Sequence, residues 1–188
     1  MCVLKLKPTT KDTDLVFVSE PEITAFRDAL FDSGFMEVVI VEEPEYRELN
    51  AYAIFEERAE GSIHADTLPR MRIDLFLKRV CGKITFSETM VLRSHSYKSF
   101  GRLAGRICSP EDIFLFKAAA GRPRDIDDMR VLAVSGMDWA IVADEYCRQA
   151  PGLGKESREV FNESLASLMS VHRIIAPASF TRKITTIL

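Results

Sequence analysis

The sequence lacks the motifs that identify several common classes of enzyme and metal site. It contains no G-x-S-x-G, no Walker phosphate loop and no G-x-G-x-x-G, which are typical of hydrolases, P-loop proteins and dinucleotide-binding domains. Its four cysteines lie far apart without a C-x-x-C pair, so neither a disulfide framework nor a zinc site is expected. There is also no signal-peptide-like stretch and no run near the roughly 20 apolar residues of a membrane-spanning helix. We therefore expect a soluble, cytoplasmic protein with reduced thiols and no membrane partner.

An excess of charge of one sign is also missing. The chain has 25 basic and 28 acidic residues, for a formal net charge of -3. This near balance argues against a protein that holds nucleic acid through bulk charge alone, although a local basic site for phosphates stays open. The histidines His64, His95 and His172 show no metal-ligand spacing, so we expect surface or structural roles for them.

Hydrophobic residues make up 47% of the 188 residues, which is enough for a core without disulfides or metal staples. Strand-like segments dominate the first half, at residues 15–18, 36–41, 52–55 and 72–77, with short edge strands or loop at 99–103 and 106–108. Helix-like segments begin at Pro21 and Ser87 and then dominate the second half, at residues 110–119, 125–135, 138–149 and from about 155 onward. This order predicts an α+β fold with helices gathered behind one sheet. We expect one compact unit, with a sheet region over 1–108, a helical region over 109–188 and a hinge near 150–155.

Two aspartates, Asp12 and Asp14, stand just before the first apolar strand segment. Because side chains at i and i+2 of a strand point the same way, their carboxylates would face one point. Carboxylate oxygens suit hard cations such as Mg²⁺. Acid-x-acid triplets also occur at residues 20–22, 43–45 and 125–127, so a solvated turn is the alternative interpretation.

Asp74 lies inside the apolar segment 72–77. Burying an unpaired carboxylate is costly, so Asp74 needs either a strand mouth or a partner. One interpretation is a salt bridge with Arg70 or Arg72. The other is a third carboxylate that joins the first two aspartates from a neighbouring strand. Three carboxylates can hold two metal ions about 3.5–4 Å apart, the geometry used in phosphoryl-type transfers.

Lys117 lies on a helix with a strong start, because Ser109 can cap it and Pro110 suits its first position. On this helix Lys117 shares a face with Ile113 and Phe114. A lysine on an apolar face commonly extends its ammonium to water. The alternative is a cation that enters a cleft and meets phosphate.

The loop and helix that follow carry a group of charged residues. Arg122 and Arg124 could each hold phosphate oxygens, because the guanidinium group suits oxyanions. Asp125, Asp127 and Asp128 fall in the first turn of the next helix. Capping and the helix dipole explain these acids without any function.

Three segments together resemble the minimal nucleotidyltransferase superfamily. Residues 7–17, KPTTKDTDLVF, are similar to its R/K-x-T-x-D-h-D-h strand, and residues 72–76, RIDLF, to the strand with its third acid. Residues 109–128, SPEDIFLFKAAAGRPRDIDD, are similar to the helix–loop–helix of AbiEii-type toxins and of a related uncharacterised, often archaeal branch. The resemblance covers roughly residues 7–146.

This resemblance implies a nucleotidyltransferase-like mixed sheet with helices on one side and a C-terminal helical region. It implies Mg²⁺ at Asp12 and Asp14 in a two-metal site completed by Asp74, which would also position or deprotonate the acceptor. An acceptor hydroxyl would attack the α-phosphate of a nucleoside triphosphate, and pyrophosphate would leave. Two metals and one cation acting on developing charge suit a reaction driven by positioning and electrostatics.

The resemblance also suggests further site residues and partners. Lys117 would stabilise charge on the phosphates, and Asp125 or Asp128 matches a further acid of the toxin motif. The cations that would bind the nucleotide are Lys11, Arg122 and Arg124. The acceptor is open between RNA, a protein and a small molecule. An antitoxin and a second copy of the chain are the candidate protein partners.

One departure from the family keeps a second function open. Family members carry a Gly-Gly or Gly-Ser turn before the two-aspartate strand, and this turn helps to hold the triphosphate. Here eleven residues precede Asp12 and none is glycine, so either translation starts upstream or the triphosphate cradle is lost. The alternative function is therefore a catalytically silent binding or interaction module. A purely structural role for the acids predicts Asp74 in a salt bridge, distant from Asp12 and Asp14.

Overall fold

The computed structural model describes residues 1–6, 12–38, 47, 49–57, 71–100 and 103–186. The chain divides into two compact units, residues 1–82 and residues 83–188. The boundary predicted between residues 108 and 109 falls inside the second unit, between its last strand and a long helix.

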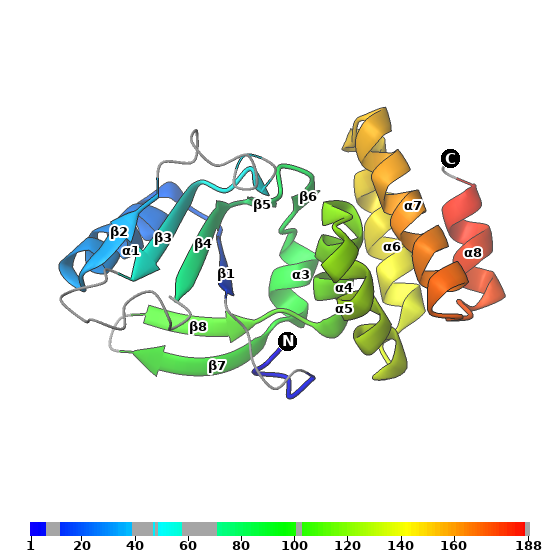
Figure 1. The fold of residues 1–188 in the computed structure, drawn as a ribbon, viewed down its shortest axis with the longest axis horizontal. Helices are drawn as coiled ribbons and strands as arrows, with labels where there is room; N and C mark the ends of the chain where they lie inside the picture. Colours follow the sequence, from blue (N-terminus) through cyan, green and yellow to red (C-terminus); the bar gives the residue numbers. More distant parts are fainter. Residues whose placement is uncertain (7–11, 39–46, 48, 58–70, 101–102, 187–188) are drawn as a thin grey trace, which may run out of the picture. The chain divides into compact units, whose positions relative to one another are not determined.

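The first unit is built on a four-stranded sheet (Figure 1). Its strands are β1 (Asp12–Phe17), β2 (Phe35–Glu37), β3 (Ala53–Glu57) and β4 (Arg72–Leu77), and the short β5 (Arg79–Val80) follows. The order is β1-β4-β3-β2, with β1 parallel to β4 and the other neighbours antiparallel. The mixed sheet and the α+β class predicted from the sequence are confirmed.

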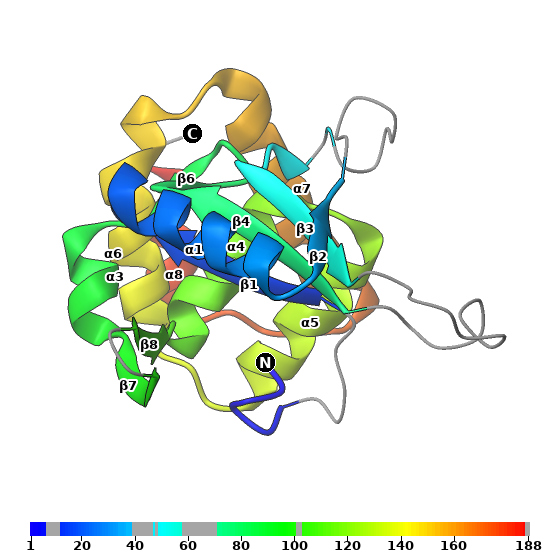
Figure 2. The same cartoon turned by 90° about the vertical axis from the view of Figure 1, so that its left-hand side faces the viewer.

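Helix α1 (Glu20–Asp32) covers one face of this sheet (Figure 2). Pro21 lies in its first turn, and Gly34 follows its end with a φ of +85°, a conformation that glycine adopts without strain. The buried core between helix and sheet consists of Ile23, Leu30, Ala53, Phe55, Ile73 and Leu75. Because successive strand residues point to opposite faces, Ile73 and Leu75 direct Asp74 to the face away from α1.

The second unit is mainly helical. Its elements are β6 (Ile84–Thr85), α3 (Glu88–Arg93), β7 (His95–Phe100), β8 (Leu103–Ile107), α4 (Pro110–Ala120), α5 (Pro123–Val134), α6 (Trp139–Gln149), the 3-10 turn η1 (Ala150–Gly152), α7 (Lys155–Val171) and α8 (Ala178–Thr185). Strands β7 and β8 form an antiparallel hairpin. Helix α4 packs against α5, α6 and α7, and α8 packs against α6.

The turn between α4 and α5 requires glycine. Gly121 has a φ of +71°, and a Cβ atom there would lie 2.4 Å from a side-chain carbon of Val160. Both the left-handed backbone and the close approach of α7 therefore exclude a larger residue. At the other end of α4, the Ser109 hydroxyl accepts a hydrogen bond from the Asp112 amide, so Ser109 caps the helix as predicted.

Most elements lie where the sequence placed them, and the differences are at their ends. Strand β4 has the predicted bounds, whereas β1 begins at Asp12 rather than at residue 15. The reason is its pairing, since β1 runs beside β4 from Arg72 onward. Strand β2 ends at Glu37 and the rest of the predicted segment 36–41 lies largely outside the described residues. The short edge strands or loop predicted at 99–103 and 106–108 correspond to β7 and β8, but their predicted bounds were wrong. The expected hinge contains the turn η1.

Candidate functional site

The parallel pair β1–β4 brings the predicted acids together in the first unit. Asp14 is the register partner of Asp74, and Asp12 is the partner of Arg72. All four side chains therefore lie on the face of the sheet away from α1. Asp14 is exposed, Asp12 is half-buried and Asp74 is fully buried. Asp74 thus lies inside its strand and not at a strand mouth.

Arg72 links two of these three carboxylates. Its Nη2 donates to Asp12 Oδ2 and to Asp74 Oδ2, at 3.0 Å in each case. Its Nε lies 2.9 Å from Asp74 Oδ1, an ion-pair contact without hydrogen-bond alignment. The predicted salt bridge to Asp74 therefore exists with Arg72, but Asp74 is not distant from the other acids, as a purely structural role would require.

The electrostatics of Asp74 follow from this crowding. Burial raises the pKa of its carboxyl from 3.8 to about 6, and the charges of Asp14 and Asp12 add to the rise. The Arg72 guanidinium acts in the opposite direction. A buried carboxylate beside like charges holds its proton more tightly, which is the usual behaviour of grouped acids. The repulsion also indicates that negative charge from β1 and β4 converges on this face.

The donor chemistry of this carboxylate group fits a hard divalent cation, since Asp12, Asp14 and Asp74 supply only oxygen ligands. In the described part of the chain, however, no three His, Cys, Asp or Glu side chains already stand in an arrangement that could hold a metal ion. The contact that competes with a metal here is Arg72, because it engages oxygens of both Asp12 and Asp74. A metal at this place would have to displace the guanidinium.

Residues predicted to act on phosphates form a cluster within the second unit. Lys117 Nζ lies 2.9 Å from Asp125 Oδ1 and 3.2 Å from Asp128 Oδ2. Arg122 Nε lies 2.6 Å from the other carboxylate oxygen of Asp125. The lysine therefore does not extend alone to water, and four of the predicted site residues come together: Lys117, Arg122, Asp125 and Asp128.

The cluster also explains Asp125. Its side chain is fully buried, and although burial opposes ionisation, hydrogen bonds from Arg122 and Lys117 hold its pKa below 3.8. Interpreting it as a helix cap was wrong, because α5 has no side-chain cap and the carboxylate is turned to the two cations. Arg124, the other predicted phosphate-binding arginine, is exposed on α5. Lys11 lies outside the described residues.

A second network of buried charges in this unit was not anticipated from the sequence. Glu145 on α6 accepts hydrogen bonds from five side chains, and Asp112 on α4 accepts from two. The donors are Ser87, Thr89, Arg93, Arg148 and Gln149 for Glu145, and Arg93 and Ser109 for Asp112. These bonds outweigh burial and lower the pKa of Glu145 to about 2. The sequence did hold one indication that Glu145 is buried, because Glu145 lies beside the apolar stripe of Val142 and Tyr146 on α6.

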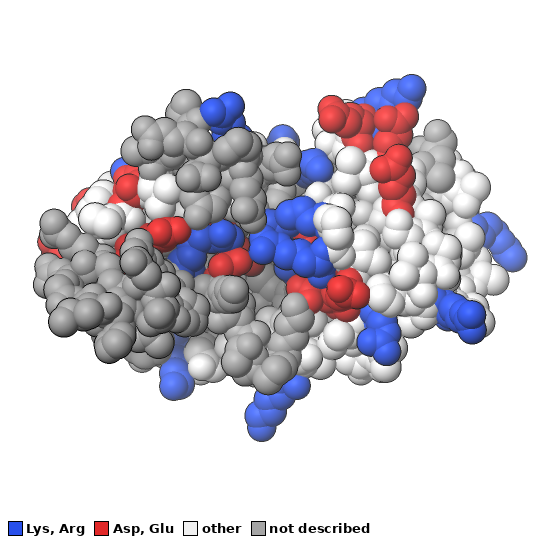
Figure 3. Space-filling view, in the orientation of Figure 1, with Lys and Arg blue, Asp and Glu red and all other residues white. Residues whose placement is uncertain are grey.

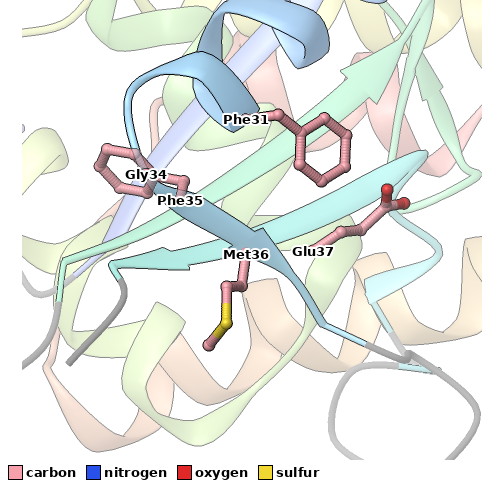
Figure 4. Close-up of a pocket in the computed structure, with 5 residues that line it drawn as sticks. All are labelled: Phe31, Gly34, Phe35, Met36 and Glu37. Carbon is pink, nitrogen blue, oxygen red and sulfur yellow. The ribbon is translucent and has the colours of Figure 1, made fainter. Parts of the chain in front are cut away.

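One surface hollow of the first unit has none of the three carboxylates in its lining. It has a volume of about 340 Å³ and is lined by Phe31, Gly34, Phe35, Met36 and Glu37. Figure 4 shows that Phe35 and Glu37 extend to one side of β2 and Met36 to the other. With only Glu37 as a charged group, this hollow offers no set of groups for nucleotide chemistry.

Other charged side chains, the four cysteines and two histidines lie outside these groups of residues. On the described part of the face in Figure 3, basic and acidic side chains are interspersed. None of the four cysteines, Cys2, Cys81, Cys108 and Cys147, forms a disulfide bond in the structure. His172 pairs with Asp127 at 3.2 Å, and His95 lies on the exposed strand β7. Among the helices described, none is both long and apolar enough to cross a membrane.

Comparisons with known proteins find similarity in structure but not in sequence. No protein-family model matches the chain, and no curated protein matches it in sequence. The structure is similar to the crystal structure of an antigenic nucleotidyltransferase-like protein from Paracoccidioides brasiliensis, with a TM-score of 0.43 and 15% sequence identity. The match covers 98% of this chain and 80% of that one. The function proposed below therefore depends on the carboxylates and their neighbours rather than on this similarity.

Proposed function

We propose that this chain is a metal-dependent nucleotidyltransferase that moves a nucleoside monophosphate from a nucleoside triphosphate to an acceptor hydroxyl. The observation that supports it best is the register of β1 and β4, which sets Asp14 beside Asp74 with Asp12 on the same face. Three carboxylates from two strands are the group that phosphoryl-type transfer needs to hold divalent cations. They lie on the three positions that the family resemblance selected.

Each residue has a distinct part in this proposal. Asp12, Asp14 and Asp74 would hold Mg²⁺, which would neutralise charge on the phosphates. Asp74 would also position the acceptor or take its proton, and its pKa of about 6 suits a base that works near neutral pH. In the second unit, Lys117 would stabilise negative charge on the phosphates, and its ion pairs with Asp125 and Asp128 would fix its position.

The direct test is transfer of labelled nucleotide with Asp14→Ala. We expect the variant to lose transfer by at least roughly a hundredfold, because a site built on electrostatic stabilisation fails without a principal ligand. Asp32→Ala is the matched control, since Asp32 is an exposed aspartate on α1 of the same unit. The assay uses each of the four ribonucleoside triphosphates with RNA, protein and small-molecule acceptors. Failure of the unmutated chain to transfer any of them would reject the enzyme function.

The biological setting within this proposal is the toxin half of a toxin–antitoxin pair. A toxin of this kind would arrest growth when expressed alone, and the arrest would depend on Asp14. Equal growth arrest by the unmutated chain and by Asp14→Ala would separate any toxicity from nucleotidyl transfer. Normal growth with the unmutated chain would contradict the toxin assignment while leaving the transfer reaction to the assay above.

A second candidate is a catalytically silent nucleotidyltransferase-fold module that binds a partner or a second copy. The observation in its favour is Arg72, whose guanidinium engages two of the three carboxylates that a metal would use. This candidate predicts no heat of Mg²⁺ binding by calorimetry and no transfer with any triphosphate. Saturable Mg²⁺ binding that Asp14→Ala removes would favour the enzyme instead.

A further inference from the structure

We propose that Arg72 is a built-in cation that competes with divalent metal for Asp12 and Asp74, so that metal binding requires the guanidinium to move away. This inference rests on the proposed function, because it concerns the same three carboxylates. It goes further by identifying a side chain of the protein that sets how readily the site takes its metal.

The first argument is the identity of the oxygens involved. Arg72 contacts Asp12 Oδ2 and both carboxylate oxygens of Asp74 within 3.0 Å. An Mg²⁺ ion needs carboxylate oxygens at about 2.0–2.1 Å. An oxygen that meets a guanidinium nitrogen at hydrogen-bond distance cannot also meet Mg²⁺ there without bringing two cations into repulsive contact. The guanidinium and a metal ion therefore compete for Asp74, both of whose carboxylate oxygens contact Arg72, and for Asp12 Oδ2.

The second argument is that the side chains differ in how firmly they are held. Asp74 is 1% exposed as a side chain and Arg72 only 12%, whereas Asp12 is 25% exposed. Asp14 is exposed, and the described residues form no ion pair with it. A metal ion can therefore approach through Asp14 and Asp12 while Arg72 still covers Asp74. Arg72 has a long side chain with several rotamers, so its withdrawal needs no change in the strands.

The consequence is a thermodynamic linkage between the arginine and the metal. When two ligands exclude each other, removal of one raises the apparent affinity for the other, and this coupling is reciprocal. Loss of the guanidinium should thus raise metal affinity at the carboxylates. An arginine with a purely structural role predicts the reverse, because loosening the two strands would weaken any metal site.

The experiment measures Mn²⁺ binding by calorimetry to the full chain and to Arg72→Met. We expect Arg72→Met to bind at least about tenfold more tightly, because the two hydrogen bonds from Arg72 no longer have to break and a single charge-assisted bond already contributes about that factor. The charge-matched control is Arg79→Gln, since Arg79 is exposed on β5 in the same unit and lies outside the carboxylate group; its affinity should equal that of the unmutated chain. Equal or weaker binding by a folded Arg72→Met would overturn the inference.

Two further variants keep the test decisive if Arg72→Met does not fold or if the metal binds elsewhere. If Arg72→Met does not fold by circular dichroism, Arg72→Lys replaces it, because a single ammonium cannot span both carboxylates as the guanidinium fork does. We expect a smaller gain in affinity there, and no gain would overturn the inference. In Arg72→Met/Asp14→Asn the gain should disappear. Its persistence would place the metal elsewhere and also overturn the inference.

The same measurements separate the inference from the proposed function. Tighter Mn²⁺ binding by Arg72→Met, with no nucleotide transfer by any chain, would support competition by Arg72 and reject the enzyme. Nucleotide transfer by the unmutated chain, with equal Mn²⁺ affinity in Arg72→Met, would support the enzyme and reject the competition. No Mn²⁺ binding by the unmutated chain or by the folded variant would reject both.

Discussion

Asp74 in the first unit and Glu145 in the second are equally buried carboxylates with opposite electrostatics. Each side chain is 1% exposed. Yet the pKa of Asp74 rises to about 6, and that of Glu145 falls to about 2. Asp74 has one guanidinium and two neighbouring acids, whereas Glu145 is surrounded by hydroxyl, amide and guanidinium donors. Burial acts on both in the same direction, so the neighbours decide the sign.

This difference indicates which of the two carboxylates stabilises the fold. A carboxylate that receives a hydrogen bond from each available donor is stabilised as an ion and holds its surroundings in place. A carboxylate pressed against other carboxylates is costly to the fold, and such crowding is a usual mark of functional sites. The contrast supports a structural role for Glu145 in the helical unit and agrees with the role proposed above for Asp74.

The largest expected effect is on stability when Glu145 is removed. Glu145→Ala removes a buried acceptor that Arg93 shares with several hydroxyl and amide donors, although Arg93 keeps Asp112. We therefore expect the free energy of unfolding to fall by about 4 kcal/mol. Urea unfolding followed by circular dichroism measures it. Glu163→Ala, at an exposed position on α7, is the control and should change stability by less than about 0.5 kcal/mol. Similar losses in both variants would break the contrast drawn here.

The next effect is a pair of opposite pH dependences, measured without divalent metal. Because the folded pKa of Asp74 lies above 3.8, its contribution to stability is complete below about pH 4 and is lost as pH rises to about 6. The unmutated chain should therefore lose about 3 kcal/mol relative to Asp74→Asn between those limits. Because the folded pKa of Glu145 lies below 4.5, its contribution is complete above about pH 5 and is lost as pH falls toward 2.

The Glu145 carboxylate should show the opposite trend. On acidification, the unmutated chain should lose up to about 3 kcal/mol of stability relative to Glu145→Gln. Unfolding in urea at a series of pH values gives both differences. The two curves should slope in opposite directions. Parallel curves would mean that burial alone, and not the neighbouring groups, sets the charge of these carboxylates.

A smaller effect is expected at the cluster of Lys117. In Lys117→Met the buried Asp125 loses its ammonium partner but keeps Arg122, so we expect a loss of about 2 kcal/mol, less than for Glu145→Ala. Lys155→Met is the control, because its ion pair with Glu159 is exposed and 3.6 Å long; such pairs contribute about 0.5 kcal/mol or less. A loss at Lys117 no larger than at Lys155 would show that Asp125 does not depend on the lysine.

Local patterns predicted much of the secondary structure. The apolar segment 72–77 became β4 with the same bounds, and Ser109 caps α4 as expected. Gly121 ends that helix because a left-handed residue is needed there. These features depend on neighbours within a few positions, which sequence shows directly. The proximity of Asp12, Asp14 and Asp74 was also accessible, since strand alternation and a family motif both selected them.

Only the tertiary structure decided which partner each charge has. Arg72 reaches Asp12 across 60 positions of sequence, and Ser87 reaches Glu145 across 58. Such pairs depend on strand register and helix packing, and no local pattern encodes either one. The sequence by itself determined the order of strands and helices and the face on which the acids converge. The tertiary structure decided that an arginine lies among those acids, because side chains meet through space and not along the chain.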